Sequence, residues 1–130
     1  MNAAIRAAVR ERAANACEYC GVEQVHLPTV TLHVEHVIAR QHLGEDALSN
    51  LALACSWCNS HKGPNLSGID PVTQDLVSLY NPRNENWNDH FEMEGAVVVG
   101  LTAVGRATIQ VLQMNSAGQV LQRARIQRAQ

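Results

Sequence analysis

Several features are scarce or missing in this chain of 130 residues. Aromatic residues make up only 4% of it, and lysine occurs once, at Lys62. A core with so few aromatic side chains must be built mainly from Ala, Val, Leu and Ile, and a structural metal would help a domain this small to fold. No apolar run reaches the roughly 18 residues that a transmembrane helix needs, so we expect no membrane partner.

The first residues also lack the features of a secretory signal. Arg6 and Arg10 interrupt this N-terminal segment, and the segment has no long apolar centre. We therefore expect a cytoplasmic protein, in a reducing compartment where paired cysteines hold metal more often than they form disulfides. The formal net charge of −2 argues against a protein that coats nucleic acid through bulk charge, but it allows an enzyme with a local basic face.

All four cysteines fall into two Cys-x-x-Cys pairs, Cys17 with Cys20 and Cys55 with Cys58. Two residues between thiolates allow both sulfurs to reach one ion, and four thiolates around Zn²⁺ make a closed, structural site. Redox chemistry could account for one such pair but does not explain two. The pairs are separated by more residues than in a simple zinc finger, so a strand and a loop are expected between them.

The patterning predicts an α+β fold in one domain, residues 1–130, with a core over about 13–66 and an α/β extension over about 67–130. In the core we expect a helix over 3–15 that stops at Asn15, strands over 29–34 and 51–54, and a short helix or turn over 56–62. Signals weaken after Pro64. There we expect strands over 76–80 and 96–101, helices over 102–115 and 120–128, and irregular connections over 65–71 and 81–91.

The segment enclosed by the cysteine pairs, with the residues just after it, carries groups that suit phosphodiester hydrolysis. His36 can act as a base near neutral pH, while Glu35 and Asn59 offer hard oxygen ligands that suit Mg²⁺ or Mn²⁺. Lys62 lies one helical turn after Asn59 and could face the same phosphate. An extended strand points Glu35 and His36 to opposite sides, but a twist or a strand end would still bring them to one ion.

From Cys17 to Pro64 the sequence resembles the HNH endonuclease family, the ββα-metal or His-Me finger nucleases. Glu35-His36 matches the family's first histidine with its acidic neighbour, Asn50 before a strand matches the middle asparagine, and Asn59 in a Cys-Asn-x-x-Lys-Gly ending matches the third position. Four zinc-binding cysteines around this motif are common in bacterial members. The resemblance covers about a third of the chain.

The resemblance implies a small ββα-metal core with a structural zinc site. It implies His36 as general base, Glu35 and Asn59 as ligands of one catalytic divalent ion, and Asn50 as the brace of the loop behind His36. It also implies that the short helix lies against the DNA minor groove. The third position holds Asn and not His, which argues for a looser Mg²⁺ site than one held by three histidines.

Two further histidines are candidates for contacts with phosphate or DNA. His33 could be such a contact or an ordinary strand side chain, and His61 could be a contact or simply exposed. Arg83 and Arg106 are further candidates for contact with DNA in the C-terminal half. Lone residues of these types are more often structural or solvated than functional.

The leading interpretation is a metal-dependent endonuclease that cuts DNA. RNA is not excluded as a substrate, because a metal-activated water needs no 2′-hydroxyl. The alternative is a zinc-ribbon module that binds nucleic acid or protein without cutting. A zinc module needs none of five residues whose joint presence favours the enzyme: Glu35, His36, Asn50, Asn59 and Lys62.

Overall fold

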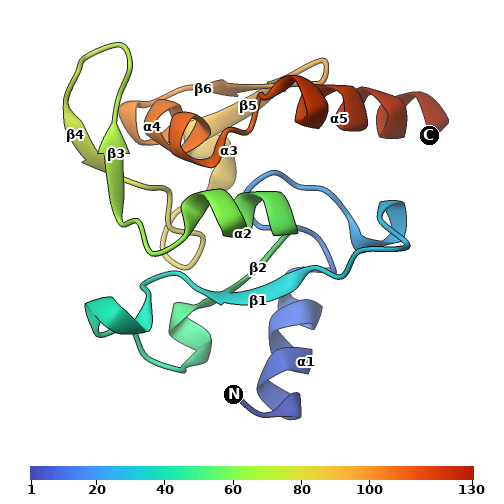
Figure 1. Ribbon diagram of the computed structural model, residues 1–130, viewed down its shortest axis with the longest axis vertical. Coiled ribbons are helices and arrows are strands. Elements are labelled where there is room, and N and C mark those ends of the chain that lie inside the picture. The colour runs from blue at the N-terminus through green and yellow to red at the C-terminus, as the bar shows by residue number, and fades with distance from the viewer. The chain divides into compact units, whose positions relative to one another are not determined.

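The computed structural model describes residues 1–130 and divides into two compact units. The first unit contains Met1–Pro64 and Asn81–Asn84, and the second contains Asn65–Tyr80 and Glu85–Gln130. Both units combine helices with two-stranded antiparallel sheets (Figure 1), so the predicted α+β class is confirmed. None of the helices has the length and apolar character that crossing a membrane requires.

The first unit is a ββα arrangement that is preceded in the chain by one additional helix. It consists of α1 (Ala3–Arg12), β1 (His33–His36), β2 (Leu51–Ala54) and α2 (Ser56–Lys62), with short 3-10 turns at η1 (Gln24–His26), η2 (Arg40–His42) and η3 (Leu48–Asn50). Strands β1 and β2 are antiparallel and lie between α1 and α2 (Figure 1). All four residues of β2 are completely buried, so this strand is the centre of the unit's core.

Local hydrogen bonds and backbone conformation set the ends of the two helices. Asn2 caps α1 by accepting a hydrogen bond from the Ile5 amide at 2.9 Å. The helix ends at Arg12, three residues before the predicted stop, because Ala14 and Asn15 both adopt left-handed backbone angles that cannot continue it. Helix α2 occupies the predicted range and ends at Gly63, whose φ of +50° favours glycine.

The strand predicted over 29–34 is shifted in the structure, where β1 begins only at His33. The reason is the side chain of Gln24, which hydrogen-bonds the preceding residues. Its Nε2 donates to the Val30 carbonyl at 2.5 Å, and its Oε1 accepts from the Leu32 amide at 2.8 Å. These backbone groups therefore have side-chain partners instead of a neighbouring strand.

The second unit contains two β-hairpins and two longer helices. Its elements are β3 (Ser67–Ile69), β4 (Leu76–Ser78), α3 (Trp87–His90), β5 (Phe91–Glu94), β6 (Val97–Gly100), α4 (Ala103–Leu112) and α5 (Ala117–Ala129). The two strands and two helices predicted here are confirmed with shifted ends. The prediction missed β3, α3 and β5, which lie wholly or partly in segments expected to be irregular. All three have only three or four residues, so their periodicity is weak.

A buried ion pair joins the β3–β4 hairpin to α4 in this unit. Asp70 is 0% exposed and accepts hydrogen bonds from Arg106 Nε at 2.9 Å and Nη2 at 2.8 Å. The Val72 amide and the Thr73 hydroxyl donate to the same carboxylate. These partners, Arg106 first, lower the pKa of Asp70 well below its ordinary value. Arg106 is thus engaged within the protein, contrary to its candidate role as a DNA contact.

We expect Asp70→Asn to lower the melting temperature at pH 7. The pKa of Asp70 is lower in the folded than in the unfolded protein, so its stabilising effect is present above the unfolded pKa of about 3.9 and is lost as the pH falls through the folded pKa. The difference in melting temperature between wild type and variant should therefore stay constant from pH 7 to about pH 5 and shrink as the pH falls further towards the folded pKa. Asp75→Asn, an exposed change in the same hairpin, is the control. A difference that does not depend on pH would contradict this assignment.

Candidate active site and metal centre

The four cysteines form one buried cluster in the first unit. Their sulfur atoms lie within 4.8 Å of one another, and Cys20 Sγ is 3.7 Å from Cys55 Sγ. A tetrahedral ion with Zn–S bonds of about 2.3 Å places its sulfurs roughly 3.8 Å apart. The cluster therefore fits a zinc ion in both ligand type and spacing.

The same local geometry occurs in both halves of the cluster. The Cys20 amide points at Cys17 Sγ at 3.5 Å, and the Cys58 amide points at Cys55 Sγ at 3.4 Å. Gly21 follows the first pair with a φ of +83°, a conformation that other residues rarely adopt. The second pair straddles the start of α2, so a metal held by the cluster also holds the first turn of that helix.

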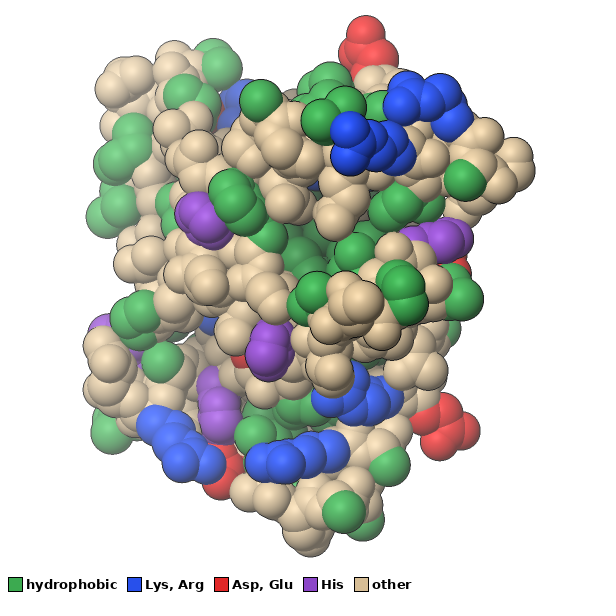
Figure 2. Space-filling model, turned by 45° about the vertical axis from the view of Figure 1, so that its right-hand side comes forward, with side chains coloured by type: hydrophobic (Ala, Val, Ile, Leu, Met, Phe, Trp, Pro, Cys, Tyr) green, Lys and Arg blue, Asp and Glu red, His purple; other side chains and the backbone are tan.

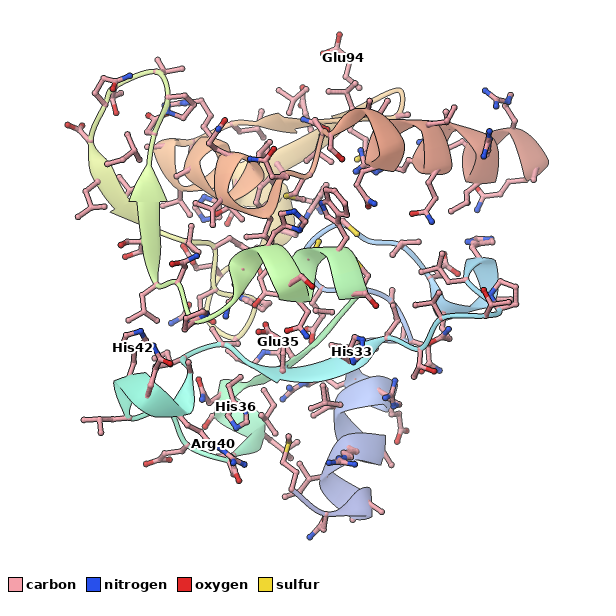
Figure 3. The ribbon with its side chains drawn as sticks, viewed as in Figure 1. His33, Glu35, His36, Arg40, His42 and Glu94 are labelled. Atoms are coloured by element: carbon pink, nitrogen blue, oxygen red, sulfur yellow. The ribbon has the colours of Figure 1, made fainter.

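A second set of predicted residues lines one cavity of about 670 Å³. Glu35 and His36 from β1 meet Asn59 from α2 at this cavity, together with residues 39–41 of the following loop. Figure 3 shows Glu35 on the side of β1 that faces α2 and His36 at the strand's end, near Arg40. The structure thus brings together the three groups that the sequence singled out for chemistry, around the end of the strand.

Glu35 is held by two partners within the protein. Its side chain is 7% exposed; Oε1 accepts a hydrogen bond from the Tyr19 hydroxyl at 2.5 Å, and Oε2 accepts one from Lys62 Nζ at 3.1 Å. Burial raises the pKa of Glu35 even though Lys62 and Tyr19 act in the opposite direction. The pKa of Tyr19 is raised as well, by burial and then by the Glu35 charge, so its hydroxyl remains a proton donor.

Lys62 does not have the position that the sequence suggested. A phosphate contact requires an accessible ammonium, but Lys62 is 2% exposed and points into the protein. Its Nζ donates to Glu35 and, at 3.1 Å, to the backbone carbonyl of His36. Because Glu35 and Lys62 are both buried, the opposite charges compensate each other. In this structure Lys62 supports β1 from α2 and is not available to a phosphate.

His36 forms a hydrogen-bonded chain with two loop residues that the sequence analysis did not select. Its Nε2 lies 2.5 Å from Asp46 Oδ1, and Arg40 donates to both oxygens of Asp46, from Nε at 3.0 Å and from Nη2 at 2.7 Å. His36, followed by Arg40, lowers the pKa of Asp46, so the carboxylate stays ionised. Ten residues separate His36 from Asp46, and no periodic pattern indicates this contact.

Asn50 connects the two ends of the loop between β1 and β2. Its Oδ1 accepts from the Ile38 amide at 2.9 Å, and its Nδ2 donates to the carbonyls of Ile38 at 2.9 Å and Glu45 at 3.0 Å. The loop is so tight that a Cβ on Gly44 would lie only 1.7 Å from the Ile38 carbonyl oxygen. Asn50 is thus placed behind the segment that carries His36.

The two remaining candidate histidines are placed outside this cavity. His33 is exposed, and its Nε2 lies 3.2 Å from Ser56 Oγ at the start of α2. His61 stacks on Trp57 with 4.1 Å between ring centroids, and its Nδ1 lies 2.8 Å from the Trp57 carbonyl. Neither residue lines the cavity with His36, so the structure does not place them with the reacting groups.

The donor set at the cavity suits a hard divalent cation by ligand type. Glu35 contributes a carboxylate and Asn59 an amide oxygen, and both groups line the same space. Each Glu35 oxygen already accepts one hydrogen bond, but a carboxylate has about four acceptor positions, so lone pairs remain for an ion. The residues therefore fit the ion, with Lys62 competing for the same carboxylate.

We expect Lys62→Met to destabilise the protein by about 3–5 kcal/mol, because it leaves the Glu35 charge buried without a partner. The double variant Lys62→Met/Glu35→Gln should lose less than Lys62→Met alone, since the uncompensated charge is gone. Urea unfolding followed by circular dichroism measures both. Arg40→Met removes an exposed cation and should cost less than about 1 kcal/mol. A double variant at least as unstable as Lys62→Met would refute the buried ion pair.

Residues 17–65 match the sequence model of a family described as HNH endonuclease. No curated protein and no solved structure matches the chain. The matched segment begins at the first cysteine and ends just after α2, so it contains both the four-cysteine cluster and the cavity with Glu35, His36 and Asn59. The family match and the four-cysteine cluster agree with the resemblance found in the sequence. Residues 17–65 thus match the HNH endonuclease family model and contain four cysteines positioned to bind a metal ion.

Proposed function

We propose that this protein is a metal-dependent endonuclease that hydrolyses phosphodiester bonds in DNA. The observation that carries the proposal is the shared cavity of Glu35, His36 and Asn59 within a segment of the HNH endonuclease family. Figure 2 supports an anionic partner, because several arginine and histidine side chains gather in the lower part of the face it shows. A local basic surface of this kind can bind phosphates although the chain's net charge is −2.

In this proposal His36 is the general base. An imidazole can accept a proton from water near neutral pH, and Asp46 orients the ring by holding Nε2 and leaves Nδ1 for the water. Asn50 keeps the loop behind His36 in place through its three hydrogen bonds. Glu35 and Asn59 would hold Mg²⁺ or Mn²⁺, which would stabilise charge on the phosphate and the leaving oxygen.

One observation favours a second candidate, a zinc-ribbon module that binds nucleic acid or protein without cutting. The Glu35–Lys62 pair is the arrangement expected of a purely structural carboxylate. In such a module His36 and Asn59 would have no chemical role. A cleavage assay distinguishes the two candidates directly, and parallel DNA and RNA substrates decide which nucleic acid is cut.

We expect the purified protein to nick supercoiled plasmid in Mg²⁺ or Mn²⁺ and to be inactive in EDTA. His36→Ala should lower the cleavage rate about 10²-fold or more, because it removes the general base. His42→Ala is the matched control, an exposed histidine on the loop that follows β1, and it does not line the cavity. Gel electrophoresis of the plasmid measures the rates. A folded, metal-loaded protein that cuts in neither ion would favour the binding module.

We expect the four-cysteine site to contain one zinc ion per chain, measurable by mass spectrometry of the metal content. Removing it, or introducing Cys17→Ser, should abolish cooperative melting of the first unit, because metal binding supplies folding free energy in a unit this small. Adding zinc back should restore the transition in the wild type only. His36→Ala should retain its zinc, and a loss of zinc there would mean that the ligands are misassigned.

A further inference from the structure

The first unit contains a second cavity, of about 650 Å³, that shares no lining residue with the first. Its walls come from the end of α1, from the loop between β1 and β2, and from the returning segment Asn81–Asn84. Two arginines line it, Arg12 and Arg83, beside the neutral polar residues Ser49 and Asn84. No role for this cavity follows from the nuclease site, which lies among other residues.

The arginine side chains at this cavity outnumber the carboxylates that neutralise their charge. Arg83 Nη2 donates to Glu18 Oε1, while Glu18 Oε2 is used by the Leu53 amide at 2.8 Å. Arg12 donates to two backbone carbonyls, those of Leu48 at 2.8 Å and Leu51 at 2.6 Å. Carbonyl oxygens satisfy hydrogen bonds but carry no net charge. Two guanidinium groups therefore share a single carboxylate.

Arg83 also has donors without acceptors. Its Nε and Nη1 atoms are buried and make no hydrogen bond within the protein. A buried donor left without a partner is costly, and such groups are rare in folded proteins. Burial, followed by the charge of Arg83, lowers the pKa of Arg12, which is the effect expected where positive charge is undercompensated. An anion in the cavity would compensate this positive charge.

We propose that Arg12 and Arg83 form a phosphate-binding site. A guanidinium presents its donors in a planar fork that matches the oxygens of a phosphate. Two guanidinium groups are better matched to the charge of a phosphate than to the single charge of a carboxylate. Ser49 and Asn84 add neutral donors at the walls. The phosphate belongs either to the backbone of a bound nucleic acid or to a free phosphate or mononucleotide. The site is separate from the cleavage cavity and does not depend on catalysis.

The test is a titration of the zinc-loaded protein without Mg²⁺, followed by nuclear magnetic resonance of the arginine Nε–H signals. Inorganic phosphate is added to one sample and a short oligonucleotide without terminal phosphates to another. We expect the Arg83 signal to shift in the phosphate sample. A shift with the oligonucleotide as well assigns the site to a nucleic-acid backbone, and a shift with phosphate alone assigns it to a free phosphate. Both outcomes support a phosphate site.

Asn84→Asp should weaken phosphate binding about tenfold, because it places a like charge at the cavity wall. Asn65→Asp is the matched control, with the same change in charge at an exposed position outside both cavities. Two results would overturn the proposal. One is an Arg83 signal that moves with neither titrant, and the other is an equal loss in both variants, which would mean that only bulk charge matters. Because Mg²⁺ is absent, the outcome is independent of whether the protein cleaves DNA.

Discussion

The four cysteine thiols join two segments that lie far apart in the chain, and the rest of the first unit depends on this connection. The first pair follows α1, and the second pair begins α2. A metal held by both fixes the first turn of α2 beside β1 and β2, which positions Asn59 at the same cavity as Glu35 and His36. The unit has few aromatic residues to build its core, so a metal cross-link of this kind would add folding free energy that the core supplies only in part.

Tyr19 links this metal centre to the candidate active site. It lies between the two cysteines of the first pair, and its hydroxyl holds Glu35 from one side while Lys62 holds it from the other. Lys62 in turn donates to the His36 carbonyl. One buried carboxylate is therefore bound by a residue of the cysteine turn and by a residue of α2. This arrangement makes the geometry at His36 sensitive to whether the cysteine cluster is intact.

The first unit thus presents two cavities of different chemistry. One combines a carboxylate, an imidazole and an amide, the groups needed for hydrolysis with a divalent ion. The other combines two guanidinium groups with neutral polar side chains, and this set suits binding of an anion but contains no base. The loop braced by Asn50 contributes residues to both cavities, so its tight conformation shapes both of them.

Much of the metal centre and candidate site could be predicted from the sequence, because the spacing of neighbouring residues determines it. Two Cys-x-x-Cys pairs predicted a cluster, and the motif from Glu35 to Asn59 predicted the family and the residues around the cavity. Strand β2 and helix α2 were also predictable, because a continuous apolar run and a Gly-Pro stop are strong local signals. Each cysteine pair and each helix stop is a short local signal, although the two pairs, like Glu35 and Asn59, lie far apart in the chain.

Only the tertiary structure decided which partner each charged group has. Lys62 is directed inward by the buried charge of Glu35, 27 positions away, and Arg83 returns to Glu18 across 65 positions. The start of β1 was likewise set by the Gln24 side chain and not by β-propensity. Such contacts depend on how distant segments pack and on which groups lose access to water, and neither can be read from local spacing. The sequence by itself therefore indicated the metal cluster and the candidate groups, while the fold determined which of those groups are accessible.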